Sequence, residues 1–126
     1  MSKKVISTLK APKAIGPYSQ AIMSENTLYC SGQIAINPKN GELVLENITK
    51  ETTQVMKNIS EVLKAVKMDF SNVVKCSIFM KDMEQYSKIN DVYAKYFTDN
   101  PPAREAVQVS VLPLNVNVEI SVIAMK

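Results

Sequence analysis

The 126-residue chain has no histidine and no tryptophan, and it has only two cysteines and three glycines. Without histidine, the usual acid/base group near neutral pH and the commonest metal ligand are missing, which excludes Ser-His-Asp and Cys-His catalysis and histidine-based zinc sites. Two cysteines without a CxxC spacing cannot form a thiolate zinc site, and three glycines leave no glycine-rich phosphate loop. We therefore predict no metal site, and any chemistry must use carboxylates, hydroxyls, backbone groups, lysine or arginine.

Arginine is also scarce. Of the 15 basic residues only one is arginine, Arg104, in the segment PPAREAVQVSVLP. An arginine at the start of a strand commonly forms a surface ion pair that contributes about 0–1 kcal/mol. The spacing of this segment does not by itself separate that role from a ligand-binding one.

Long apolar runs are missing as well, so no segment is expected to span a membrane. The first residues lack an apolar leader pattern, which favours a cytoplasmic location. The net charge of +3 comes from lysines scattered along the chain, a weak pattern for nucleic-acid binding. Cys30 and Cys76 each lie in an apolar run. This position is typical of small buried residues, and we expect both to be free thiols in a reducing compartment.

The chain is the length of one domain, residues 1–126, and the elements alternate without a linker or repeat. The order β-β-β-α-β-α-β-β predicts an α+β fold, a single sheet with two helices on one face. The residue patterns place the strands at 4–7, 21–23, 28–31, 73–80, 106–111 and 116–124, and the helices at 49–66 and 82–97. In the first helix the charged residues, Glu51 among them, are expected to face away from the apolar stripe.

The last two strands are expected to pair as a hairpin about Pro113. Strand alternation puts Arg104 opposite in direction to Val107, and Glu119 opposite to Val118 and Ile120. The hairpin would then bring Arg104 and Glu119 to one surface. Such a mixed sheet face suits an oligomer interface with pockets better than open water. A solvated Glu119 remains the simpler interpretation, because glutamate is seldom buried.

Other polar residues fall at notable places. In the second helix, Asn90 interrupts an aromatic stripe of Tyr86, Tyr93 and Phe97, either as a satisfied helix amide or as a ligand group. Ser31-Gly32 reads most simply as a strand ending in a turn. These patterns alone indicate only a candidate pocket for an anionic ligand.

Four blocks of the sequence, in order along nearly the whole chain, carry a family resemblance. They are AxGPYSQA, SGQIxxxPxxGEL, VVKxxxFxKDMxxYxxxNxVYxxYF, and PxAR followed by LPxxVxVEI. Together they resemble the RidA (YjgF) family of reactive imine deaminases. The resemblance implies a chorismate-mutase-like fold and a homotrimer with ligand sites between subunits.

The resemblance also implies a function and a set of site residues. Members hydrolyse 2-imino or enamine acids, such as 2-aminoacrylate and 2-iminobutanoate, to 2-keto acids and ammonia without a cofactor. The family's carboxylate-binding arginine corresponds to Arg104 and its pocket glutamate to Glu119, as catalytic residues. The remaining substrate-binding positions correspond to Tyr18, Ser31, Gly32 and Asn90.

Physical chemistry gives these positions their roles. A guanidinium can clamp a carboxylate with two parallel hydrogen bonds, which a lysine cannot match, and Gly32 lets a backbone N–H approach the same group. Partial burial would raise the pKa of Glu119 toward a useful value for activating water. Tyr18 and Asn90 are expected to line the site from a neighbouring subunit.

Two departures and two alternatives stand beside this prediction. Glu105 follows the arginine where the family usually has a small residue, and Ala106 replaces a cysteine that many members carry. Alternation points Glu105 away from Arg104. The first alternative function is a trimeric protein that binds small carboxylic acids, or a regulatory partner, without turnover. The second is an RNA-directed activity reported for some relatives.

Overall fold

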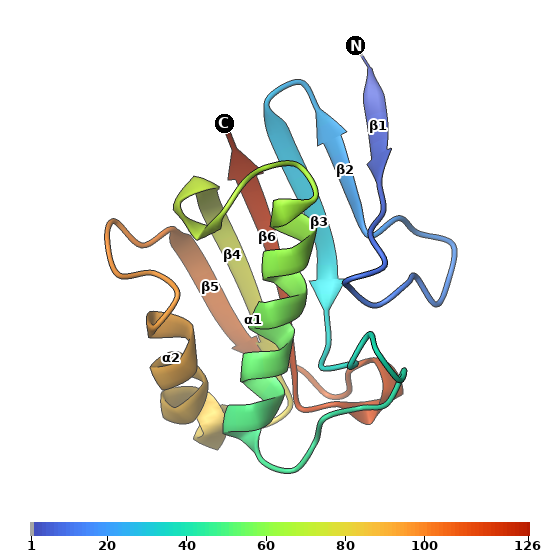
Figure 1. The fold of residues 1–126 in the computed structure, drawn as a ribbon. Helices are drawn as coiled ribbons and strands as arrows, with labels where there is room; N and C mark the ends of the chain where they lie inside the picture. The colour runs from blue at the N-terminus through green and yellow to red at the C-terminus, as the bar shows by residue number, and fades with distance from the viewer. Residues whose placement is uncertain (1) are drawn as a thin grey trace.

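Six strands form one sheet in the order β1-β2-β3-β6-β4-β5 (Figure 1). The computed structural model describes residues 2–126. The strands are β1 (Lys3–Ile6), β2 (Ala21–Ser24), β3 (Thr27–Gln33), β4 (Val73–Met80), β5 (Ala103–Gln108) and β6 (Val118–Met125). The predicted hairpin of β2 and β3 is confirmed, since these strands pair antiparallel across residues 25 and 26.

The predicted hairpin between the last two strands is wrong. Strand β6 lies between β3 and β4, antiparallel to both, while β5 pairs with β4 in parallel at the edge of the sheet. The connection from β5 to β6 passes β4, which lies between them in the sheet, and contains a short 3-10 turn, Pro113–Asn115, with positive φ at Leu114 and Asn115. The residues of β6 that face the helices are buried, so this strand belongs in the centre, whereas β5 is half-exposed and suits an edge.

Both helices cover the same face of the sheet (Figure 1), as predicted. Helix α1 (Ile48–Lys64) begins at Asn47, whose side chain accepts a hydrogen bond from the Lys50 N–H at 2.8 Å. Helix α2 (Tyr86–Ala94) follows a 3-10 turn, Met83–Gln85, and is shorter than the predicted 82–97. Within residues 2–126, neither helix has the length and apolar character that crossing a membrane requires.

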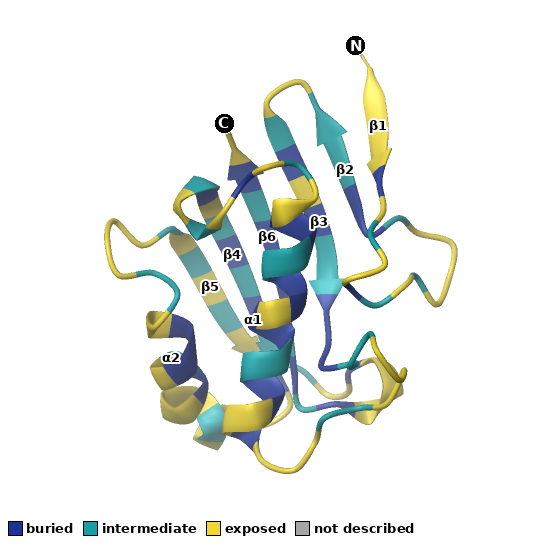
Figure 2. Ribbon diagram, viewed as in Figure 1, coloured by how far each residue is buried: buried dark blue, intermediate teal, exposed yellow. Residues whose placement is uncertain are grey.

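The core lies between the helices and the sheet (Figure 2). Its strand residues face α1, and Cys30 and Cys76 are among them as buried free thiols, as predicted. Burial raises the pKa of Cys30 to about 12, so this thiol stays protonated and unreactive near neutral pH.

Glu51 differs from the expectation for the first helix. The pattern pointed it outward, but it is fully buried in the first turn of α1. Its two carboxylate oxygens accept hydrogen bonds from the backbone N–H and the side-chain amide of Asn117, at 2.8 and 2.7 Å. A buried carboxylate is tolerated when such donors replace water. Glu51 thereby fastens the start of β6, which carries Glu119, to the start of α1.

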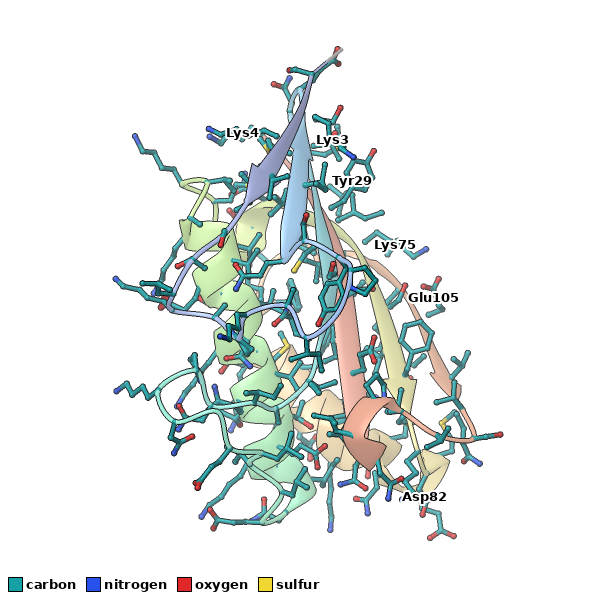
Figure 3. All side chains as sticks on the ribbon, turned by 90° about the vertical axis from the view of Figure 1, so that its right-hand side faces the viewer. Lys3, Lys4, Tyr29, Lys75, Asp82 and Glu105 are labelled. Carbon is teal, nitrogen blue, oxygen red and sulfur yellow. The ribbon has the colours of Figure 1, made fainter. Side chains whose placement is uncertain are left out.

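In residues 2–126 both helices lie on one face of the sheet, and no helix covers the other face (Figure 1). Figure 3 shows Tyr29, Lys75 and Glu105 on this side, away from α1. Tyr29 is 48% exposed and Val107 is 40% exposed, and Lys75 and Glu105 form an ion pair at 2.8 Å. We call this surface the open face. It mixes apolar and polar side chains, as predicted, but β5 presents Val107 here and turns Arg104 to the helix side, the reverse of the expectation for this strand.

Candidate functional site

Arg104 lies on the helix side of β5. In the parallel ladder it pairs with the buried Cys76 of β4, so its side chain starts beneath α2. Its Nη1 donates a hydrogen bond to Asn90 Oδ1 at 2.6 Å, and its Nη2 donates to Tyr86 Oη at 2.7 Å. The half-buried guanidinium is therefore held by two residues one helical turn apart.

Two aromatic rings complete the surroundings of this arginine. The guanidinium carbon lies 5.6 Å from the ring centre of Tyr86 and 4.9 Å from that of Tyr93, both within cation–π range. Tyr86, Asn90 and Tyr93 of the predicted stripe thus share one face of α2 that turns toward Arg104, whereas Phe97 lies beyond the end of the helix, against Phe70 and Tyr93. Asn90 belongs to the same chain as the arginine that it contacts, which corrects the expectation that it lines the site only from a neighbouring subunit.

Glu119 lies on the opposite side of the sheet. It pairs with Phe79 of β4, three residues along from the partner of Arg104, and therefore points to the open face. Together with Tyr18, Ser31 and Gly32 it lines a hollow of about 310 Å³. Arg104 and Asn90 are not among the residues that line this hollow.

Gly32 is in close contact with the Glu119 carboxylate. A Cβ at position 32 would fall 2.0 Å from Glu119 Oε2, so only glycine leaves room for the carboxylate there. Partial burial raises the pKa of Glu119 above its ordinary value. A carboxyl group with a raised pKa is the stronger base when ionised, which is the property that water activation needs.

The loop before β2 positions Tyr18 at the same hollow. The Tyr18 hydroxyl accepts a hydrogen bond from the Ile15 N–H at 3.3 Å, and Ser31 Oγ donates to the Ser19 carbonyl at 2.6 Å. These contacts tie the loop to the end of β3.

Gln20 organises this loop, and the sequence analysis did not select it. Its buried amide accepts a hydrogen bond from the Thr8 N–H at 2.7 Å and donates to the carbonyls of Thr8, Ala11 and Pro12 at 3.0, 3.3 and 2.8 Å. The sequence signal for this role was a polar residue placed directly before a strand, next to the apolar Ala21.

The structure therefore divides the six predicted site residues into two groups. Arg104 and Asn90 form one group on the helix side, and Tyr18, Ser31, Gly32 and Glu119 form the other around the hollow. The expectation that Arg104 and Glu119 share one surface of the chain is wrong, because the two strands do not pair with each other: Arg104 pairs with Cys76 of β4 and Glu119 with Phe79, which point to opposite faces of the sheet. The expectation for Glu105 is confirmed, since its carboxylate lies on the open face with Lys75 and Ser77.

A second hollow, of about 350 Å³, lies beside the exposed side of α1 and gathers four lysines that are scattered in the sequence: Lys10, Lys39, Lys57 and Lys64. It contains none of the predicted site residues. In the part of the chain that the structure describes, residues 2–126, no three His, Cys, Asp or Glu side chains lie close enough together to hold a metal ion.

Comparison with known proteins identifies the class to which this fold and site belong. The family model described as Endoribonuclease L-PSP matches residues 8–126. A structure of a Yersinia pestis protein of the conserved Rid family superposes with a TM-score of 0.96 at 49% identity, over 99% of this chain and 100% of that one. The chain therefore belongs to the RidA (YjgF) family, as its sequence blocks indicated.

Two further relatives show which activity and which ligand occur among proteins similar to this chain. The 2-iminobutanoate/2-iminopropanoate deaminase of Bos taurus is 48% identical over 98% of this chain and 90% of its own length. E. coli TdcF, whose crystal structure contains bound serine, is 32% identical, with a TM-score of 0.93 over 98% of both chains. Both likenesses extend over almost the whole of this chain, including both groups of site residues.

Proposed function

We propose that this protein is a homotrimeric deaminase that hydrolyses 2-imino acids, such as 2-iminobutanoate and 2-iminopropanoate, to 2-keto acids and ammonia without a cofactor. One observation carries the proposal: the anion-binding group and the candidate base occupy two separate places on one chain. In the described part of the chain neither place is a complete site, since the side-chain hydrogen bonds of Arg104 go to Asn90 and Tyr86 and not to a carboxylate, and Arg104 does not line the Glu119 hollow.

A second copy of the chain resolves this separation. In a closed ring of subunits, the Arg104 edge of one protomer meets the Glu119 hollow of the next, and every protomer contributes to two sites. The open face supports such assembly, because Tyr29 and Val107 are exposed there and no helix or strand among the described residues covers them. Three copies are the number that the family resemblance implies.

The proposed reaction begins with binding of the substrate carboxylate. The planar guanidinium of Arg104 has five N–H donors, of which two are engaged by Asn90 and Tyr86, so three remain for the ligand. The N–H near Gly32 of the neighbouring subunit approaches the same ligand, and Ser31 and Tyr18 line the cavity around it. This holds the C=N carbon in place for attack, which can lower the barrier by several kcal/mol.

Hydrolysis then requires one water and a proton shuttle. Glu119 takes a proton from water as the water oxygen bonds to the imine carbon and the C=N electron pair moves to nitrogen. The Glu119 carboxyl group then returns this proton to the nitrogen, which gives an amino alcohol with an OH and an NH2 group on the same carbon. In the last step the hydroxyl proton moves through Glu119 to the NH2 group, the C–N bond breaks with its electron pair on nitrogen, and the oxygen forms the C=O of the 2-keto acid as ammonia leaves. An enamine such as 2-aminoacrylate enters this sequence after a proton is added at C3.

The test couples a PLP-dependent threonine or serine dehydratase to this protein, with semicarbazide competing for the imine and keto-acid formation as the readout. The wild-type protein should form keto acid faster than the trap captures the imine, and Arg104→Ala should not. No acceleration by the wild-type protein would refute the deaminase proposal.

The competing proposal is a protein that binds small carboxylic acids without turnover. Arg104 and Gly32 would serve that function equally well, so Glu119 is the discriminating residue. If the protein only binds, Glu119→Gln leaves both keto-acid binding and the rate of imine hydrolysis unchanged. If it is an enzyme, binding persists and turnover falls.

RNA is a further candidate ligand, since the family model carries the name of an endoribonuclease and the lysine hollow beside α1 offers clustered positive charge. That hollow includes neither Arg104 nor Glu119, so RNA binding there would leave both groups of site residues unexplained. Incubation with a labelled single-stranded RNA at low and high salt tests it, since phosphate contacts weaken steeply with salt.

A further inference from the structure

The hydroxyl of Tyr86 lies directly on the guanidinium of Arg104. It accepts a hydrogen bond from Arg104 Nη2 at 2.7 Å, while Asn90 Oδ1 occupies Nη1 at 2.6 Å. Tyr86 is the first residue of α2 and is 37% exposed, so its hydroxyl is accessible to a ligand from solvent. The family resemblance assigned Tyr86 no role.

The donors and acceptors at this contact leave one proton free. A tyrosine hydroxyl that accepts a hydrogen bond still has its own O–H to donate. Within residues 2–126 the Tyr86 hydroxyl is the acceptor in its hydrogen bond with Arg104, and no hydrogen bond is found in which it donates. The Tyr93 hydroxyl also lacks a hydrogen-bond partner, but it is buried, whereas Tyr86 is exposed. Tyr86 therefore offers an unused donor beside the proposed carboxylate site.

We propose that Tyr86 binds the ligand directly: its hydroxyl accepts from Arg104 and donates its own proton to the carboxylate that Arg104 holds. This rests on the proposed function of Arg104 as the carboxylate anchor and adds one more donor to that anchor. A ligand with a carboxylate satisfies the guanidinium and the hydroxyl together, because one carboxylate accepts about four hydrogen bonds. A phenylalanine at this position would keep the ring beside the guanidinium but would lose the contact.

The local electrostatics favour this role. Contact with the Asn90 amide and the positive charge of Arg104 lower the pKa of Tyr86 below its ordinary value. A more acidic hydroxyl is a better hydrogen-bond donor to an anion. Tyr93 packs its ring 4.9 Å from the guanidinium carbon and limits its movement toward the core, so Arg104 and the Tyr86 hydroxyl stay together.

The variant Tyr86→Phe removes only this hydroxyl. Losing one hydrogen bond to a charged group weakens binding by roughly 10-fold. We expect KM for the imino acid, and Kd for 2-oxobutanoate measured by calorimetry, to rise by that factor with kcat within about twofold, since the carboxylate is bound equally before and during the reaction. Tyr96→Phe is the matched control, because Tyr96 follows α2 but makes no contact with Arg104; it should behave as wild type.

A second comparison separates direct binding from mere positioning of Arg104. If the hydroxyl contacts the ligand, Tyr86→Phe still weakens 2-oxobutanoate binding by about threefold or more when combined with Arg104→Lys, whose ammonium lacks the planar fork. If Tyr86 acts only by holding the guanidinium, its effect disappears in that background and the proposal of direct contact is overturned.

The binding measurement also keeps this inference separate from the proposed activity. Wild-type protein that binds 2-oxobutanoate without hydrolysing imines would refute the deaminase, while the Tyr86 comparison would still be decided by Kd. Wild-type protein that does both, with Tyr86→Phe indistinguishable from it, would refute the role of Tyr86 alone. Wild-type protein that binds no keto acid would refute both.

Discussion

Arg104 and Glu119 lie on opposite faces of one sheet, because their strands flank β4 and pair with residues of opposite orientation, Cys76 and Phe79. The two proposed catalytic residues are thus separated within each chain. The proposed function requires a neighbouring subunit to bring them together, and mixing subunits that carry different substitutions tests this requirement.

Co-expression of Arg104→Ala and Glu119→Gln chains should restore activity that neither variant has alone. In a randomly mixed ring with sites between neighbours, about a quarter of the sites combine an intact Arg104 from one chain with an intact Glu119 from the next. Keto-acid formation in the dehydratase-coupled assay measures the recovery, with each variant expressed alone as the control. Mixed assemblies that remain inactive would show that both residues act from one chain.

Arg104→Lys should lower kcat/KM by roughly 10- to 100-fold although the charge is kept. The ammonium cannot make two parallel hydrogen bonds to a carboxylate, nor can it retain the contacts with both Asn90 and Tyr86. The same dehydratase-coupled assay measures the change. Lys75→Arg, at an exposed ion pair on the other face, is the matched control for exchange of the two basic residues. Equal activity of Arg104→Lys and wild type would contradict the clamp.

Glu119→Gln should lower kcat by about 10²- to 10⁴-fold, the usual contribution of a general base, while 2-oxobutanoate still binds. In the wild-type protein the rate should rise with pH through the pKa of Glu119, which burial places above its ordinary 4.5. A pH–rate profile measures this limb. If Glu119→Gln showed the same rise of the rate with pH, the titration would belong to another group.

The same variant should gain thermal stability near pH 7. Burial raises the pKa of Glu119 in the folded state, so the folded protein holds its proton more tightly than the unfolded chain, and stability falls as pH rises through that interval. Glutamine avoids this loss. Melting curves should show Glu119→Gln above wild type at pH 7 and the two close together below pH ~4, where both states of wild type are protonated. A variant less stable at pH 7 would contradict the assignment of the burial cost to Glu119.

Gly32→Ala should reduce kcat strongly with little effect on stability. The new methyl group would fall 2.0 Å from Glu119 Oε2, and a carboxylate at the end of a flexible side chain can move away, so the base is displaced while the fold persists. Gly16→Ala is the matched control, because its Cβ meets nothing closer than 3.5 Å. The coupled assay measures the rate and a melting curve measures the stability. An unchanged rate would mean that the contact with Glu119 is dispensable.

Glu51→Gln should destabilise the protein by about 2 kcal/mol, because one of the two donors of Asn117 would face an amide nitrogen instead of an oxygen. For a chain of this length that corresponds to a fall in Tm of roughly 8 °C. Glu46→Gln serves as the control, since its ion pair with Lys50 is exposed and contributes little. Equal melting temperatures for the two variants would show that Glu51 does not fasten β6 to α1.

Local patterns predicted many elements of this fold. The apolar spacing of residues 49–66 marks α1, the β-rich run at 73–80 matches β4, and the turn residues 24–27 give the β2–β3 hairpin, because each pattern depends on neighbours within a few residues. The sequence also pointed to Arg104 by its rarity and to Asn90 by its place in an aromatic stripe. Those two residues are in contact in the structure.

Strand pairing was decided only by the tertiary structure. Alternation tells which residues of a strand share a face, but it does not tell which strand lies beside which, because pairings distant in sequence depend on how the whole core is buried. Placing β6 in the centre and β5 parallel to β4 turned Arg104 toward α2 and Glu119 toward the open face. It also buried Glu51, whose outward position on the helix pattern gave no sign of the Asn117 amide that would meet it. The amino-acid sequence determined which groups this protein has for chemistry, and the packing of distant strands decided where each of them points.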